Sequence, residues 1–108
     1  LIDVVTSISG SGPAYYFLLT EVLSKLGKKL GLNKKDAYIF AEATFIGSAS
    51  LLEQSKSTTL SLRKNVTSPG GTTEAALSVL MKKNKDLEFL IENALNRAIL
   101  KAKELNTK

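Results

Sequence analysis

The 108-residue sequence contains no cysteine and no histidine. It therefore has no disulfide bonds, no thiolate chemistry and no imidazole acid–base catalyst, and it lacks the usual zinc ligands, so we expect no metal site. No apolar run approaches the roughly 20 residues that a transmembrane helix needs. No basic segment typical of a signal peptide is present. Because the absence of cysteine is compatible with a reducing compartment, we expect a cytoplasmic protein without a membrane partner.

Basic residues are in moderate excess. The sequence has 15 Lys and Arg residues and 10 Asp and Glu residues, which gives a net charge of +5. The lysines are scattered, and most fall near expected helix ends, where a cation complements the helix dipole or stays hydrated. Aromatic residues make up only 6%, and no nucleic-acid-binding motif is present. A solvated basic surface is therefore the favoured interpretation, and we expect no nucleic-acid partner.

Hydrophobic residues make up 44% of the sequence, which is typical of a globular chain. The length fits one domain over residues 1–108. Because the chain opens on Leu1 rather than on methionine, we expect it to be a piece of a longer protein.

The first predicted helix runs from Pro13 to Leu30 and follows the segment Ser9-Gly10-Ser11-Gly12. Ser11 or Gly12 can cap this helix, and proline suits its first turn. Gly31 then provides a typical helix end. Apolar residues recur at helical spacing and indicate one buried face; they are Phe17, Leu18, Val22, Leu26 and Leu30.

Asn33 is the predicted N-cap of a second helix, which extends from Lys34 to Gln54. Between Ala41 and Leu51 the only charged residue is Glu42, and the others are mostly apolar or small. A helix with this composition is buried on more than one side. A domain of this size wraps such a helix poorly by itself. We infer that another subunit covers part of it.

The second half is predicted to contain a short helix over Leu60–Val66, a loop over Thr67–Thr73 and a helix through Ala75–Met81. A final helix is expected from Asp86 to Leu105, with one apolar stripe. Asn84 is expected to close one helix or to cap the next. No strand or internal repeat is indicated, so the prediction is an all-α bundle of about five helices.

The loop Ser68-Pro69-Gly70-Gly71-Thr72-Thr73 is the strongest candidate for a functional site. Its two glycines permit positive φ angles and expose backbone amides. A helix is expected to start at once, with Gly71 or Thr72 as the cap and Glu74 in the first turn. Such a helix start offers unpaired N–H groups and a positive dipole end, which suit a carboxylate or a phosphate. The three hydroxyl side chains add orientable donors and acceptors.

An ordinary turn between helices has a similar composition, and on the pattern alone it is the more frequent interpretation. A nucleotide-binding phosphate loop does not fit, because the Gly-Lys-Ser/Thr ending is missing. The clustering of hydroxyl side chains at one helix start favours a binding site. No other segment offers comparable chemistry.

Two motifs resemble the C-terminal domain of the pyrroline-5-carboxylate reductases. Ser9-Gly10-Ser11-Gly12-Pro13-Ala14-Tyr15, followed by an amphipathic helix, is similar to the opening of that domain. The stretch from Leu62 to Thr73 resembles the most characteristic segment of the family. The order of the motifs and the closing helix also match. The family often has a proline shortly before the Leu-Arg pair, where this chain has Thr59 or a neighbouring residue other than proline. The pair Lys64-Asn65 replaces a pair that is commonly acidic and polar in the family.

The resemblance implies a domain that forms an interleaved homodimer or a higher homo-oligomer. It also implies an oxidoreductase of proline biosynthesis, which reduces pyrroline-5-carboxylate to proline with hydride from NADPH or NADH. The family binds this cofactor on an N-terminal dinucleotide-binding domain. No Gly-x-Gly-x-x-Gly motif following a strand is present, so we expect that domain to be absent from this chain, which alone should be inactive.

The resemblance further implies roles for the loop residues. The substrate carboxylate would be held at Gly70, Gly71, Thr72 and Thr73, mainly through backbone N–H groups, and Ser68 would add a hydroxyl contact. The hydroxyl of Thr73 would meet the ring nitrogen and is the expected catalytic residue. Ser11, Gly12 and Pro13 are expected to be structural. No cofactor-binding residue is assigned in this chain.

Two other functions are compatible with the sequence. A non-enzymatic helical oligomerisation module would need the same buried helices but would give the threonine-rich loop no role. A basic nucleic-acid binder would need a clustered basic face and salt-sensitive binding.

Overall fold

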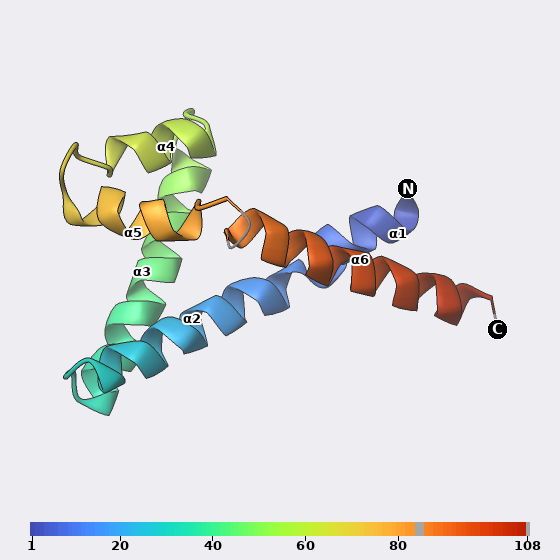
Figure 1. Cartoon of the computed structure of the whole chain (residues 1–108), viewed down its shortest axis with the longest axis horizontal. Helices are drawn as coiled ribbons and strands as arrows, with labels where there is room; N and C mark the ends of the chain where they lie inside the picture. Colours follow the sequence, from blue (N-terminus) through green and yellow to red (C-terminus); the bar gives the residue numbers. More distant parts are fainter. Residues whose placement is uncertain (84–85, 108) are drawn as a thin grey trace. The chain divides into compact units, whose positions relative to one another are not determined.

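A computed structural model of the chain describes residues 1–83 and 86–107. Its helices are α1 (Ile2–Val5), the π-helix η1 (Thr6–Gly10), α2 (Gly12–Lys29), α3 (Lys34–Gln54), α4 (Thr59–Asn65), α5 (Thr72–Leu80) and α6 (Leu87–Asn106) (Figure 1). The described residues contain no strand, so the all-α prediction is confirmed. The chain divides into two compact units, Gly12–Thr58 and the remainder.

The first unit is a helical hairpin of α2 and α3, and Gly31 sets its turn. Gly31 has a φ of 123°, which residues other than glycine rarely adopt. Its N–H donates to the carbonyl of Lys28 at 3.1 Å, and the N–H of Leu32 donates to the carbonyl of Gly27 at 3.0 Å. This pair of bonds is the Schellman motif, which satisfies the last carbonyls of a helix. The predicted helix end is therefore confirmed.

Asn33 starts α3 as predicted. Its side chain accepts a hydrogen bond from the N–H of Asp36 at 2.8 Å and donates one to the Asp36 carboxylate at 2.9 Å. The two side chains therefore hold the first turn of the helix reciprocally.

Replacing Asn33 by alanine is expected to lower the free energy of unfolding by about 1 kcal/mol, since an N-cap bond is lost. Chemical denaturation at a fixed protein concentration measures the effect. Asn33→Ser, which keeps an uncharged acceptor oxygen at the cap, is the control and should cost less. Equal losses in the two variants would mean that the cap bond is not the cause.

The hairpin packs through small residues near its turn and through aromatic rings farther along. A Cβ built on Gly27 of α2 would lie 3.4 Å from the Cβ of Ala37, so the two helices approach closely there. The ring of Phe45 stacks on Tyr16 with centroids 5.8 Å apart and meets Phe17 edge-on at 6.1 Å. Such aromatic pairs add to the stability that burial provides.

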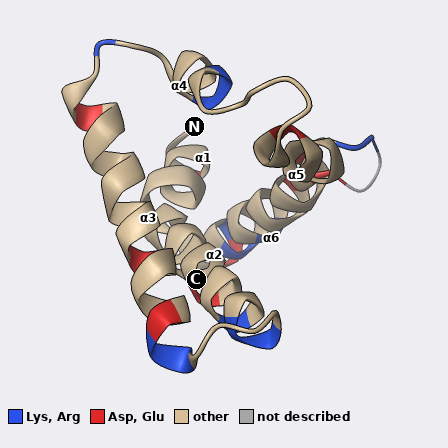
Figure 2. Cartoon of the chain, turned by 90° about the vertical axis from the view of Figure 1, so that its left-hand side faces the viewer, with Lys and Arg blue, Asp and Glu red and all other residues tan. Residues whose placement is uncertain are grey.

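Most of α3 away from α2 stays open. Ala37 and Ala41 are the only buried hydrophobic residues among those the structure describes. Phe40 is 57% exposed, Ile46 60% and Leu51 52%. Figure 2 shows basic residues at both sides of the α2–α3 turn and few charges along the rest of α3. An apolar surface of this kind requires a partner or a ligand to cover it.

The second unit begins with helical structure that the sequence did not lead us to expect. The predicted first helix started at Pro13 with a cap at Ser11 or Gly12, but the chain is already helical from Ile2. Ser11 is itself in a helical conformation, with φ −86° and ψ −20°, where an N-cap would be extended.

Side-chain hydroxyls of this segment bond to its own backbone. Those of Thr6, Ser7 and Ser9 donate to the carbonyls of Ile2, Val4 and Val5, respectively. Such bonds to the preceding turn tend to bend a helix rather than to stabilise it, and serine and glycine have low helix propensity. The segment is helical nonetheless, and it includes the wider π-helical turn of η1, Thr6–Gly10.

Helix α6 packs against α1 and η1. Its N-cap is Asp86, whose side chain accepts from the N–H of Phe89 at 2.9 Å. At its other end the amide of Asn106 donates to the Asp3 carboxylate at 3.1 Å. Asn84, a predicted cap, lies outside the described residues. Within residues 1–83 and 86–107, no helix combines the length and hydropathy of a membrane span.

Candidate functional site

The threonine-rich loop lies between α4 and α5, and Thr67 fixes its entry. The hydroxyl of Thr67 donates to the carbonyl of Arg63 at 2.6 Å, and its N–H donates to the carbonyl of Lys64 at 3.1 Å. These bonds satisfy carbonyls that the end of α4 leaves without partners. The loop therefore leaves the helix in a defined direction.

Ser68, Pro69, Gly70 and Gly71 form a β-turn. The N–H of Gly71 donates to the carbonyl of Ser68 at 3.0 Å. Gly70 has a φ of 72°. Proline at the second position and a positive-φ glycine at the third are characteristic of a type II turn. A Cβ on Gly71 would lie 3.1 Å from the Ser68 carbonyl oxygen, so the close approach also favours glycine there.

Helix α5 starts directly after this turn, with Gly71 as its N-cap, as predicted. Gly71 has no side chain with which to cap the helix. Its own N–H is engaged with Ser68, so it is not a free donor. The first open amides of the helix are those of Thr72, Thr73 and Glu74, because these N–H groups have no carbonyl four residues earlier in the helix.

The hydroxyl groups of Ser68, Thr72 and Thr73 lie around this helix start. Among the described residues we find no hydrogen-bond partner for these three hydroxyls, whereas that of Thr67 is bonded. Thr73 is half-buried, and Ser68 and Thr72 are exposed. The loop thus combines open hydroxyls, open amides and the positive end of a helix dipole, which suits a carboxylate.

Sequence reasoning missed one contact in the loop. The N–H of Gly70 donates to the Glu74 carboxylate at 3.0 Å. The signal was present, because a glutamate three residues after the N-cap is typical of a capping box. Glu74 therefore ties the turn to the first turn of α5.

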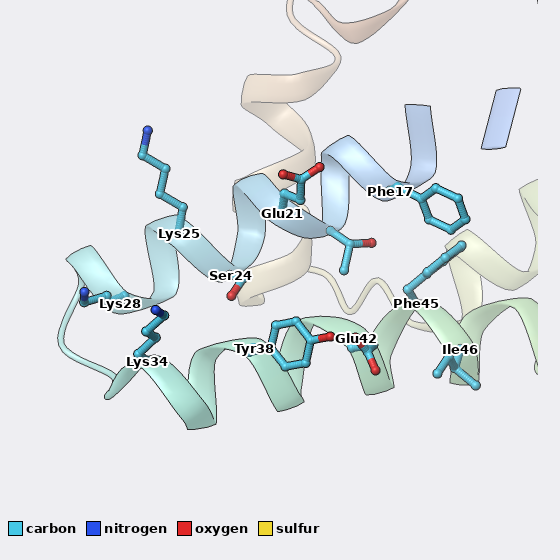
Figure 3. Close-up of a pocket in the computed structure, with 11 residues that line it drawn as sticks. Phe17, Glu21, Ser24, Lys25, Lys28, Lys34, Tyr38, Glu42, Phe45 and Ile46 are labelled. Atoms are coloured by element: carbon cyan, nitrogen blue, oxygen red, sulfur yellow. The ribbon is translucent and has the colours of Figure 1, made fainter. Parts of the chain in front are cut away.

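A second candidate is an open groove of about 610 Å³ between α2 and α3 (Figure 3). Phe17, Phe45 and Ile46 lie at one end of it, and lysines lie at the other. Between them a hydrogen bond to Glu42, together with its negative charge, raises the pKa of the Tyr38 hydroxyl. The described residues contain no group of His, Cys, Asp and Glu side chains that could hold a metal ion. The groove offers an apolar surface but no evident catalytic group.

Fold and loop together define an all-α domain with exposed apolar helix faces and a candidate anion-binding loop. The sequence pattern of a family described as pyrroline-5-carboxylate reductase dimerisation matches residues 1–105. The chain therefore belongs to this family, as its two motifs predicted.

Individual relatives agree with the family match. A pyrroline-5-carboxylate reductase of Pseudomonas aeruginosa is 43% identical over 104 residues, which cover 96% of this chain and 37% of that protein. One from Staphylococcus aureus is 40% identical over 102 residues, which cover 94% of this chain and 37% of that protein. The chain thus spans well under half the length of these relatives.

Solved structures show the same fold. A pyrroline-5-carboxylate reductase from Coxiella burnetii superposes with a TM-score of 0.87 at 43% identity, over 96% of this chain and 38% of that one. A pyrroline carboxylate reductase from Plasmodium falciparum, solved with NADP bound, gives a TM-score of 0.85 at 34% identity. That match covers 95% of this chain and 38% of the other.

Proposed function

We propose that this chain is the C-terminal, substrate-binding and dimer-forming domain of an enzyme that reduces pyrroline-5-carboxylate to proline. In this reaction a hydride from NADPH or NADH adds to the carbon of the C=N bond, and one proton completes the ring nitrogen of the product. The nicotinamide is oxidised as the imine is reduced. The observation that carries the proposal is the open, hydroxyl-lined start of α5 in a chain of this family.

The substrate fits the loop because its carboxylate is attached next to its ring nitrogen. The carboxylate would accept hydrogen bonds from the amides of Thr72 and Thr73, at the positive end of α5. Ser68 would add a hydroxyl contact, and Gly70 and Gly71 would shape the turn. The hydroxyl of Thr73 would then reach the ring nitrogen. This arrangement fixes the position of the carbon that accepts hydride.

Thr73 orients the substrate rather than supplying an acid of matched pKa. No histidine is present, and a threonine hydroxyl is a poor proton donor at neutral pH. The proton on the ring nitrogen of the product would come from water or would already be present on a protonated imine. The catalytic contribution of this domain is therefore positioning and polarisation of the C=N bond.

The dinucleotide would be bound mainly outside this chain. The Pseudomonas aeruginosa relative has much additional length, since the match covers only 37% of it. The cofactor is proposed as NADP or NAD, and the NADP-bound Plasmodium falciparum structure supports a nicotinamide cofactor. A cytoplasmic location, as for other enzymes of amino-acid synthesis, belongs to the same proposal.

The partner of the open helix faces is proposed to be a second copy of the chain. One such face of α3, the Gly47 face, consists of Phe40, Ala43, Gly47 and Leu51, which share one side of the helix at 3.6 residues per turn. Ala37 and Phe45, which contact α2, lie on another side. The description of the family as a dimerisation domain supports this choice of partner.

An association module without catalysis would use the same faces, and it is the main alternative. It would leave the open hydroxyls at α5 without a role. The deciding experiment is an assay of the full-length protein with pyrroline-5-carboxylate and either NADPH or NADH, following the nicotinamide absorbance. Oxidation of the nicotinamide that depends on the imine and yields proline is expected. A correctly folded dimer without this activity would favour the alternative.

A further inference from the structure

We infer that Glu74 is a positioning residue of the loop, whose carboxylate braces the turn before α5 while the first amides of α5 stay open for substrate. The inference rests on the proposed function, because it assigns Glu74 a task in substrate binding. It concerns a residue that has no proposed contact with the substrate.

Helix α5 is capped differently from α3 and α6. The side chains of Asn33 and Asp86 cap those two helices. Each accepts a hydrogen bond from the N–H three residues later, that of Asp36 or Phe89, respectively. A side-chain cap at α5 would take the amide of Glu74 in the same way and would stand beside the amides of Thr72 and Thr73, where the carboxylate is proposed to bind. Gly71 in the cap position leaves that amide open, but it also leaves the junction without a side-chain brace.

Glu74 supplies the missing brace from the other side. In a capping box, the glutamate three residues after the cap accepts the N–H of the cap residue itself. Here the N–H of Gly71 is already donated to the Ser68 carbonyl at 3.0 Å. The Glu74 carboxylate instead accepts the N–H of Gly70 at 3.0 Å. The turn is therefore tied to the first turn of α5 without using the amides of Thr72 and Thr73.

This brace sets the distance between the two parts of the proposed site. Ser68 lies at the start of the turn and Thr73 lies inside the helix, with two glycines in between. The bond from Gly71 to Ser68 closes the turn, and the bond from Gly70 to Glu74 joins the turn to a side chain of α5. Without the second bond the turn would be freer to move relative to α5, because glycines restrict the backbone little, and Ser68 would be held less firmly relative to Thr73.

The hydrogen bond and the negative charge of Glu74 have opposite consequences for an anionic substrate. A carboxylate at a helix N-terminus is favourable for the helix, but it repels a second carboxylate bound nearby. The benefit to substrate binding must therefore come from the bond. Glu74→Gln keeps an acceptor oxygen and removes the charge, whereas Glu74→Ala removes both.

Steady-state kinetics of the full-length protein separates these contributions. Glu74→Ala is expected to raise KM for pyrroline-5-carboxylate on the order of tenfold, with Glu74→Gln within about threefold of the original value. KM for NADPH should not change. Glu88→Ala is the matched control, since Glu88 is an exposed glutamate in the first turn of α6. This variant should leave both KM values unchanged.

The bond itself is measured independently of catalysis, by NMR of the Gly70 amide in this chain. The amide proton should move upfield in Glu74→Ala, which removes the acceptor, and should move less in Glu74→Gln, which keeps an acceptor oxygen. An insensitive Gly70 amide would overturn the inference even if the protein is an active reductase. If the unaltered protein has no reductase activity, the proposed function is wrong, and the positioning role of Glu74 is wrong with it.

Two kinetic results would also overturn it. An unchanged KM for pyrroline-5-carboxylate in Glu74→Ala would mean that the brace does not position the loop for substrate. A rise in KM in Glu74→Gln as large as in Glu74→Ala would assign the effect to the charge rather than to the hydrogen bond.

Discussion

Thr73→Val in the full-length protein is expected to lower kcat/KM for pyrroline-5-carboxylate by about 100-fold, the usual effect of removing one donor that acts on the reacting group. Valine has nearly the shape of threonine and keeps the backbone N–H that is proposed for the carboxylate. The loss should therefore report the hydroxyl alone. Initial rates of nicotinamide oxidation at varied substrate concentration measure it. KM for the dinucleotide should stay the same.

Thr67→Val provides the matched control, because it removes a hydroxyl from the same loop. The Thr67 hydroxyl is bonded to the Arg63 carbonyl at 2.6 Å. Its loss should lower the free energy of unfolding by about 1 kcal/mol and change kcat/KM far less than Thr73→Val does, because the bond from the Thr67 N–H to the Lys64 carbonyl still fixes the loop entry. Thr67→Val is thus expected to lower stability more than activity, and Thr73→Val to lower activity more than stability. An unchanged kcat/KM in Thr73→Val would remove Thr73 from the mechanism.

The elements predicted correctly from the sequence are those whose ends are determined by residues within one turn. Asn33 and Gly31 act only on residues within one turn, and their hydrogen bonds are those expected of an N-cap and of a Schellman motif. Pro69 and Gly70 likewise specify their turn without help from distant residues. Short-range interactions of this kind can be recognised in any sequence that contains them.

The helical segment before Pro13 could not be predicted in the same way. Its serines and glycines have low intrinsic helix propensity. The hydroxyl bonds to the preceding turn, such as that of Ser7, do not favour a helix either. The segment packs against α6, which is far away in the sequence. Intrinsic propensity does not include such a contact.

The candidate site was predicted as a set of residues but not as an arrangement. Gly71 was expected among the free amide donors, but its N–H is used to close the turn. Glu74 was placed in the first turn of α5, yet its bond to Gly70 depends on a side-chain conformation that the sequence pattern does not specify. The roles proposed for Ser68 and Thr73 stay predictions until the variants are measured.

Gly47→Ala is expected to weaken association of the chain, although the geometry of the single chain alone argues for the opposite effect. A Cβ on Gly47 meets no described atom within 4 Å, and alanine is favoured over glycine in a helix by about 1 kcal/mol. If the Gly47 face packs against a second copy, the added methyl group overpacks that contact at a cost of about 1–3 kcal/mol. The dimer dissociation constant should then rise by roughly 5- to 150-fold.

Gly27→Ala is the control for adding a methyl group to a helical glycine, because Gly27 lies in the last turn of α2 and faces α3 of its own hairpin. Its added Cβ would meet Ala37 at 3.4 Å, an ordinary contact distance. This variant should leave the dissociation constant unchanged. Sedimentation equilibrium over a range of concentrations measures both constants. A Gly47→Ala chain that is more stable and equally dimeric would place the interface on another face, because glycine at position 47 would then serve no close approach between helices.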